Sequence, residues 1–148
     1  MPIRQLTPKA DIDRFIANRV DAMKSELLRR LHYVGERVLN QARANSIKSY
    51  KDQTGNLRSS VGYVIAVDGR VVETSSFEVV KKGHKGSQGG KDFALQKVSE
   101  FPRGIVLIVV AGMNYAQHVA DRGRDVLDSS ELLANRLVPE MLRKLGLK

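Results

Sequence analysis

Apolar side chains recur at helical intervals along the first third of the chain. From Ile12 to Ala42 the intervals are four, four and three residues, and this order repeats, so that the side chains share one face of a helix. This face consists of Ile12, Ile16, Val20, Met23, Leu27, Leu31, Val34, Val38 and Ala42. Asp11 is a suitable N-cap residue, and the pattern predicts one helix from Ile12 to about Asn45, about 50 Å long. Gly35 is the one weak point inside it.

Such a helix is too long to lie wholly on one small domain, whose radius of gyration is about 15 Å. We therefore expect part of its apolar face to pack against something outside its own chain. The other faces carry basic side chains, most simply a solvated surface: Arg14, Arg19, Lys24, Arg29, Arg30, Arg37 and Arg43. Residues 1–11, with Pro2 and Pro8, predict an extended N-terminal arm.

After the first helix the pattern changes to that of strands. Residues 61–67 and 70–75 flank Asp68-Gly69, the preferred sequence for a two-residue type I′ hairpin. A third strand is expected at residues 105–111, entered by a turn at 101–104. Because this third strand is apolar throughout, we expect it to be central in the sheet.

Glycine and lysine dominate the segment between the hairpin and the third strand. Residues 81–91 hold four glycines, four lysines and no apolar side chain, which predicts a flexible basic loop at about 80–97. A last helix is expected from Ser129, with Asp128 and Glu131 spaced as in a capping box. Its apolar face would consist of Leu132, Leu133, Leu137, Met141 and Leu145. Pro139 should kink this helix or split it in two.

The order of elements predicts the α+β class: a long N-terminal helix, a small, mainly antiparallel sheet with a hairpin, and a C-terminal helix. With 148 residues, we expect a single domain over residues 12–148. The chain has no cysteine, which excludes disulfides and thiolate metal sites. His32, His84 and His118 lack the spacing of a zinc site, so no metal is expected.

The net charge of +9 favours polyanionic neighbours: nucleic acid, an acidic protein surface or a membrane face. No signal-peptide pattern is present, and the most apolar stretch has only seven residues. We therefore expect a soluble, cytoplasm-compatible protein that does not enter a membrane.

The sequence offers little that predicts catalysis. The glycine loop does not fit a phosphate loop, since Lys85 stands where the first glycine belongs and Asp92 follows Gly90-Lys91. Ser59 and Ser60 lack the GxSxG elbow, although a triad with a distant histidine stays open. Asp121 and Asp125 flank arginines, most simply as an ion-paired turn. We expect no enzyme and no cofactor; a catalytic site assembled only by the fold is the remaining alternative.

The stretch DQTGNLRSSV, residues 52–61, follows the long helix. We interpret Thr54, Gly55, Asn56 and Leu57 as a structural turn, because glycine accepts a positive φ and the polar side chains bond to nearby backbone. Leu57 and Val61 should enter the core as the strand begins.

In this position TGNLRSSV resembles the TGxLrxSi signature of the phage tail-component family, also called tail-completion or head–tail joining proteins. Residues 114–119, NYAQHV, followed by Gly123, resemble the family's YAxxVExG segment, with Ala120 or Asp121 where glutamate is common. Residues 124–128, RDVLD, resemble a variant of the same family.

The resemblance implies a virion protein in the neck of a tailed virus, made in the host cytoplasm. It would form one ring around the DNA channel, six-fold by analogy, between the portal side of the head and the tail tube or tail terminator. Tail completion and tail termination both remain open, and no catalysis is implied.

Lys81, Lys82, Lys85 and Lys91 are then candidate contacts to a partner or to DNA, and Tyr115 and Val119 are expected in the core. The alternative is a non-specific DNA-binding protein whose basic helix face and loop follow the phosphate backbone.

Overall fold

The computed structural model describes residues 8–49, 55–112 and 126–146. It has the predicted α+β class and the predicted antiparallel sheet. The elements are α1 (Lys9–Ser49), α2 (Asn56–Ser59), β1 (Val61–Val67), β2 (Arg70–Thr74), α3 (His84–Val98), β3 (Ile105–Ala111) and α5 (Asp128–Lys144).

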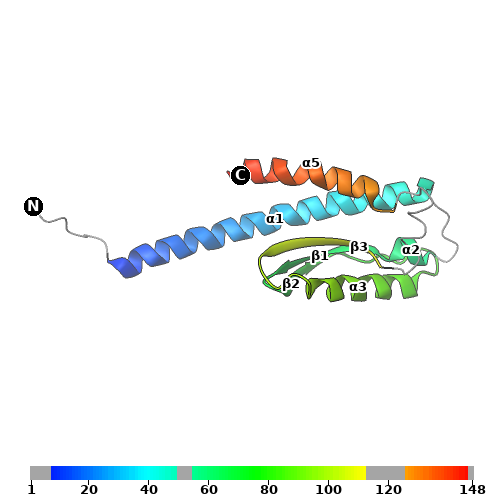
Figure 1. Ribbon diagram of the computed structural model, residues 1–148, viewed down its shortest axis with the longest axis horizontal. Helices are drawn as coiled ribbons and strands as arrows, with labels where there is room; N and C mark the ends of the chain where they lie inside the picture. Colours follow the sequence, from blue (N-terminus) through cyan, green and yellow to red (C-terminus); the bar gives the residue numbers. More distant parts are fainter. Residues whose placement is uncertain (1–7, 50–54, 113–125, 147–148) are drawn as a thin grey trace, which may run out of the picture.

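The elements form layers around the long helix (Figure 1). α5 runs antiparallel along one side of α1, the sheet lies on the other side of α1, and α3 covers the opposite face of the sheet. The N-terminal part of α1 extends well beyond all the other elements. This layering leaves α1 with two very different halves.

α1 is longer than predicted and begins earlier. It has 41 residues, about 60 Å at a rise of 1.5 Å per residue, and starts at Lys9, so residues 9–11 are helical rather than part of an extended arm. The Pro8 carbonyl accepts the backbone N–H groups of Asp11 (3.0 Å) and Ile12 (3.2 Å). Asp11 therefore lies in the first turn and is not the N-cap. A proline at a helix start is tolerated because the first N–H groups have no partner within the helix. Residues 1–7 lie outside the described part of the chain.

The sheet has the order β2-β1-β3, with both pairs antiparallel. The prediction that residues 105–111 form the central strand was wrong: β1 is central and β3 pairs only with β1 among the described strands. β3 is apolar throughout because both of its faces are covered. Leu107 and Val109 pack in the cluster with α1 and α5, whereas Val106 and Ile108 pack in the cluster with α3.

The hairpin between β1 and β2 is confirmed. Val67 pairs with Arg70 across Asp68 (φ 50°) and Gly69 (φ 80°), the positive φ pair of a type I′ turn. The register shifts between Ile65 and Ala66, a β-bulge in this ladder.

The predicted flexible loop at 80–97 was wrong, because residues 84–98 form helix α3. Its glycines are contact residues. A Cβ on Gly86 would collide with the backbone of Asn56, and a Cβ on Gly90 would collide with the backbone of Ser60. Ala94 and Val98 continue the same face and are buried. Glycine is therefore needed here for close backbone approach, not for mobility.

α5 begins at Asp128, one residue earlier than predicted, and Leu127 occupies the N-cap position, so the expected capping box does not form. The helix runs through Pro139 without being split. Met141 is buried as predicted, but Leu132 is 71% exposed and does not belong to the apolar face. The Ser130 hydroxyl, itself buried, donates a hydrogen bond of 3.0 Å to the Val38 carbonyl and ties α5 to α1.

Candidate functional site

The segment from Gly55 to Ser60 forms a joint between α2, α3 and β1. Gly55 has φ of 79° and precedes α2, so Asn56 and Leu57 begin a one-turn helix instead of a simple turn. Leu57 and Val61 are buried, as expected. The Asn56 side-chain oxygen accepts the Gly86 N–H (3.1 Å), which connects the joint to α3. Thr54 lies outside the described residues.

The two serines of this joint are structural. Both are fully buried. The Val80 N–H donates to the Ser59 hydroxyl oxygen at 2.7 Å, and the Ser60 hydroxyl donates to the Leu57 carbonyl at 2.7 Å. A nucleophile would need a general base within hydrogen-bond reach, and the bonds found at these hydroxyls run to backbone groups. In the described residues, the two serine hydroxyls of the joint therefore hold elements in place.

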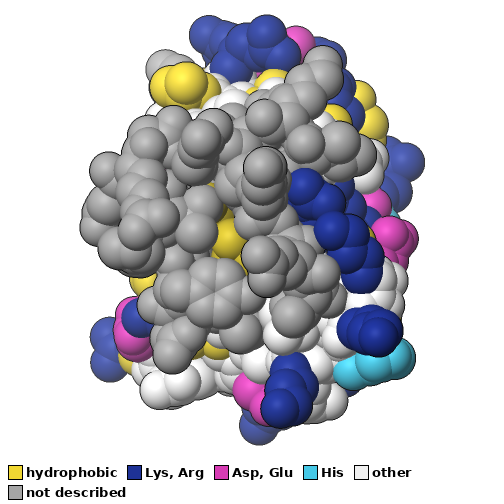
Figure 2. Space-filling model, turned by 90° about the vertical axis from the view of Figure 1, so that its right-hand side faces the viewer, with side chains coloured by type: hydrophobic (Ala, Val, Ile, Leu, Met, Phe, Trp, Pro, Cys, Tyr) yellow, Lys and Arg dark blue, Asp and Glu magenta, His cyan; other side chains and the backbone are white. Residues whose placement is uncertain are grey.

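The four candidate lysines are exposed, but they do not share one mobile loop. Lys81 and Lys82 precede α3, and Lys81 has φ of 54°. Lys85 and Lys91 lie on α3 six residues apart, which turns them onto different sides of the helix. Figure 2 shows the end of the molecule where α3 begins, with Lys and Arg side chains at several separate places around it. The fold thus spreads the positive charge over this end.

A polar cluster that sequence reasoning missed lies under β1. Tyr63 on β1 is fully buried, and its hydroxyl donates to the Glu36 carboxylate at 2.7 Å. The His32 Nδ1 lies 2.8 Å from the same hydroxyl oxygen, which accepts from Nδ1–H since its own proton goes to Glu36. Burial, followed by the bond to Glu36, raises the pKa of Tyr63. His32 and Glu36 stand four residues apart on α1, a spacing that places them on one helix face but does not reveal Tyr63.

The Tyr63 ring explains Gly35. A Cβ on Gly35 would lie 2.9 Å from the ring, so the glycine inside α1 makes room for an aromatic side chain of the sheet. Predicted as a weak point, Gly35 is a packing position in the structure.

The N-terminal part of α1, residues 9–24, is here called the α1 extension. Each of its residues is exposed. Its large apolar side chains keep much of their surface in solvent: Ile12 39%, Phe15 65%, Ile16 55%, Val20 46% and Met23 50%. Farther along the same stripe Leu31, Val34 and Val38 are buried against the sheet and α5. One apolar stripe is therefore covered at one end only.

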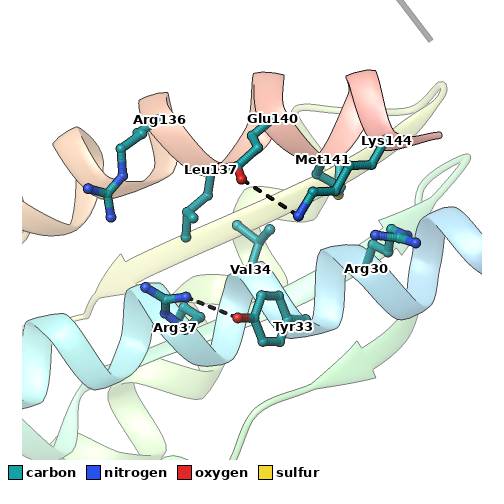
Figure 3. Close-up of a pocket in the computed structure, with 9 residues that line it drawn as sticks. All are labelled: Arg30, Tyr33, Val34, Arg37, Arg136, Leu137, Glu140, Met141 and Lys144. Atoms are coloured by element: carbon teal, nitrogen blue, oxygen red, sulfur yellow. Dashed lines mark hydrogen bonds and ion pairs between the residues drawn. The ribbon is translucent and has the colours of Figure 1, made fainter. Parts of the chain in front are cut away.

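A pocket of about 230 Å³ lies between α1 and α5 (Figure 3). Its apolar lining comes from Tyr33 and Val34 on α1 and from Leu137 and Met141 on α5. Its charged lining is mostly basic: Arg30, Arg37, Arg136 and Lys144, with Glu140. Lys144 pairs with Glu140 at 3.6 Å, and Arg37 donates to the Tyr33 hydroxyl at 3.0 Å. Sequence reasoning could not find this pocket, because it exists only where α5 meets α1.

Within the described residues, no group of three or more His, Cys, Asp or Glu side chains is placed to hold a metal ion. Nor does any helix in that part of the chain have a stretch long and apolar enough to cross a membrane. The family-like residues 114–119 and 123–125, and with them Tyr115, Val119 and Asp121, fall outside the described part of the chain.

Compared with known proteins, the chain matches no family model, no curated protein and no solved structure. The resemblance to the phage tail-component family therefore remains a prediction from residues 54–61, 114–123 and 124–128.

Proposed function

We propose that this chain is a structural subunit of the neck of a tailed virus. In this role it is a tail-completion ring subunit that joins the tail tube to the head connector around the DNA channel. The observation that carries the proposal is the α1 extension, a helical segment that projects from the body with an uncovered apolar stripe. Large exposed apolar surfaces mark interaction sites, and a subunit of an assembly has a use for such a stripe.

The TGNLRSS segment supports the same role. Its described residues, 55–60, form the joint between α2, α3 and the central strand, and the hydroxyls of the two buried serines bond to backbone groups. A motif used for this joint suits a protein whose function is shape and contact, with no catalysis and no cofactor.

The partners in this proposal are further copies of the chain in a ring, six-fold by family analogy, the connector on the portal side, and the tail tube or tail terminator. Lys81, Lys82, Lys85 and Lys91 face solvent and are the proposed contacts to an acidic partner surface or to DNA in the channel. The proposed location is the virion, after assembly in the host cytoplasm.

Quantitative mass spectrometry of intact virus particles from the source of the gene tests the proposal. We expect the protein at a small fixed copy number, on the order of six or twelve per particle, as closed rings require. Particles that contain the other tail proteins but lack this one would show the proposal to be wrong.

A second candidate is a non-specific DNA-binding protein, favoured by the net charge of +9. Its affinity would come from phosphate contacts and would fall steeply as salt rises. Among the described residues, the basic side chains on the end shown in Figure 2 lie at several separate places, whereas a protein that follows the phosphate backbone needs them along one path.

A further inference from the structure

We infer that the α1 extension of one copy docks on the body of a second copy, with Phe15 inserted in the pocket between α1 and α5. The inference rests on the self-assembly that the proposed function includes. It adds which surfaces meet and which side chain anchors them.

The first reason is the continuity of the apolar stripe. The intervals of four, four and three residues place Ile12, Met23 and Val34 at equivalent positions of an 11-residue repeat. Val34 is 2% exposed because the body covers it, whereas Ile12 is 39% and Met23 50% exposed. The extension thus presents the same kind of surface that the rest of α1 buries, and it needs a protein surface in the same way.

Charge argues for a protein partner and against a polyanion. The extension carries four basic side chains (Lys9, Arg14, Arg19 and Lys24) and three acidic ones (Asp11, Asp13 and Asp21). A nearly balanced helix has little attraction for nucleic acid or for an anionic membrane, both of which select basic faces. Its partner should offer an apolar depression and positive charge near Asp11, whose ion pair with Arg14 is long (3.8 Å) and exposed to solvent.

The α1–α5 pocket has both properties. Val34, Leu137 and Met141 give it apolar walls, and four of its five charged lining residues are basic. Figure 3 shows Arg136 extending from α5 toward α1. Among the described residues Arg136 has no carboxylate within ion-pair distance, so an acidic side chain from outside could pair with it.

Phe15 is the best anchor that the extension offers. It is the most exposed of its large apolar side chains, at 65%. Aromatic residues in well-packed pockets carry most of the energy at protein interfaces, and guanidinium groups stack on aromatic rings. Asp11 stands one turn before Phe15 on the same helix face, which places it at the basic rim when Phe15 is inserted.

The chain cannot make this contact with itself. Phe15 and Tyr33, a pocket residue, lie on the same continuous helix 18 residues apart, about 27 Å along its axis. The occupant must come from another copy. Such a contact joins two different surfaces, so each copy donates an extension and receives one, and the contact can close into a ring.

Site-directed cross-linking tests the inference, and the chain is suited to it because it has no cysteine. One preparation carries Asn18→Cys, one turn from Phe15, and a tagged preparation carries Glu140→Cys at the pocket rim. Both changes leave Phe15, Asp11 and the pocket arginines intact. After mixing at high concentration with a short bismaleimide, we expect the mixed dimer as the main product.

Two control positions define the background. Ala17→Cys lies on the opposite side of the extension from Phe15, and Glu131→Cys is an exposed position on α5 that does not line the pocket. Either control should give at least about fivefold less mixed product. Cross-links between two Asn18→Cys chains as the main product would show that extensions pair with each other and would overturn the inference. Equal yields for test and control positions would overturn it as well.

A charge exchange gives a second readout. Asp11→Arg and Arg136→Glu should each weaken self-association about tenfold in analytical ultracentrifugation, a factor at the lower end of the coupling measured for close charge pairs at interfaces. The double variant should recover most of the loss. If both single variants are folded by circular dichroism and the double variant does not recover self-association, the result counts against this docking.

The two proposals fail in different ways. A protein found in virus particles that gives no Asn18–Glu140 cross-link there or in solution refutes the docking and leaves the neck role intact. If the purified protein gives the specific cross-link but the protein is absent from virus particles, the docking stays intact and the neck role is refuted.

Discussion

Tyr63 combines a fully buried ring with a hydroxyl that reaches polar side chains of α1. The ring fills the space that Gly35 leaves open, and the hydroxyl donates to Glu36 while His32 contacts the same oxygen. Glu73 on β2 lies 3.8 Å from His32, so the cluster joins the helix to two strands. At the scale of single residues, this cluster holds the body by polar contacts as well as by apolar packing.

The raised pKa of Tyr63 predicts how stability changes in alkali. Burial and the Glu36 carboxylate keep the Tyr63 hydroxyl of the folded protein protonated at pH values where a tyrosine in the unfolded chain, with a pKa of about 10, loses its proton. The folded state then binds more protons than the unfolded state, so the free energy of unfolding falls as pH rises above about 10. Tyr63→Phe should show a shallower fall between pH 8 and pH 11 in urea denaturation.

The control for this measurement is Tyr33→Phe, because Tyr33 is 57% exposed and should keep the wild-type slope. At pH 8, Tyr63→Phe should also lose about 1 kcal/mol, since Glu36 loses a hydrogen-bond donor. Identical alkaline slopes for wild type and Tyr63→Phe would contradict the assignment of the slope to this hydroxyl.

At the scale of elements, α3 depends on glycines at contact positions. Gly83, Gly86 and Gly90 are buried against the joint. A Cβ added to Gly89, in contrast, would lie 3.9 Å from the Gly112 carbonyl oxygen, an ordinary contact distance. The same residue type therefore has opposite roles within one helix: some positions need the absence of a side chain, and one tolerates it.

A matched pair of alanine substitutions tests this view of α3. Gly86→Ala should destabilise the protein by about 1–3 kcal/mol, because its Cβ would meet the Asn56 backbone, which cannot rotate away. Gly89→Ala should be neutral or stabilise by up to about 1 kcal/mol, since alanine favours the helix and has room there. Chemical denaturation measures both. Equal effects would show that residues 84–98 do not pack as a helix against the joint.

α1 allows a second matched pair, because two valines occupy its stripe in different surroundings. Val34→Ala should cost about 2 kcal/mol or more, the loss of two buried methyl groups and the cavity left behind. Val20→Ala should cost less than about 0.5 kcal/mol at low protein concentration, since Val20 is 46% exposed. A large cost for Val20→Ala in the dilute monomer would mean that the extension folds back on the body.

Features set by contacts between residues close in the sequence were predicted, and features set by contacts between distant residues were missed. The helical stripe of α1 and the Asp68-Gly69 hairpin are local patterns, and both were found in the structure. α3 was missed because its glycines are explained only by Asn56 and Ser60, which are about 30 residues away. The edge position of β3 was missed because apolarity reports covered faces and not strand order. The pocket between α1 and α5 joins residues about 100 positions apart, and no local pattern announces it.

At the scale of the whole molecule, the distribution of charge is the property that separates the two candidate functions. The chain is strongly basic, with a net charge of +9 and a pI of about 10.0, but the α1 extension is nearly balanced. The excess positive charge therefore belongs to the rest of the chain, and the two candidate functions assign it different uses: contacts to acidic partners or channel DNA in the assembled neck, or direct binding of DNA by the isolated protein.

Titration of duplex DNA at two salt concentrations distinguishes these functions in the isolated protein. A DNA-binding protein that neutralises several phosphates loses affinity steeply with salt, with a slope of about −0.9 per phosphate contact. A neck subunit should bind weakly or not at all outside the assembled ring. The quadruple variant Lys81→Gln, Lys82→Gln, Lys85→Gln and Lys91→Gln removes four of the positive charges near α3 and keeps the length of each side chain close to that of lysine.

If these lysines contact DNA, the variant's salt slope should be smaller than that of wild type by about 0.9 for each lysine that contacts a phosphate. A control variant with Lys9→Gln and Lys24→Gln, which removes two charges from the α1 extension, should leave the slope unchanged. An undiminished slope in the quadruple variant would show that these lysines, on α3 and just before it, do not contact DNA. The arginines of α1 and α5 would then be the next candidates. Since glutamine is compatible with a helix, we expect the variants to stay folded, and circular dichroism checks that their helix content is unchanged.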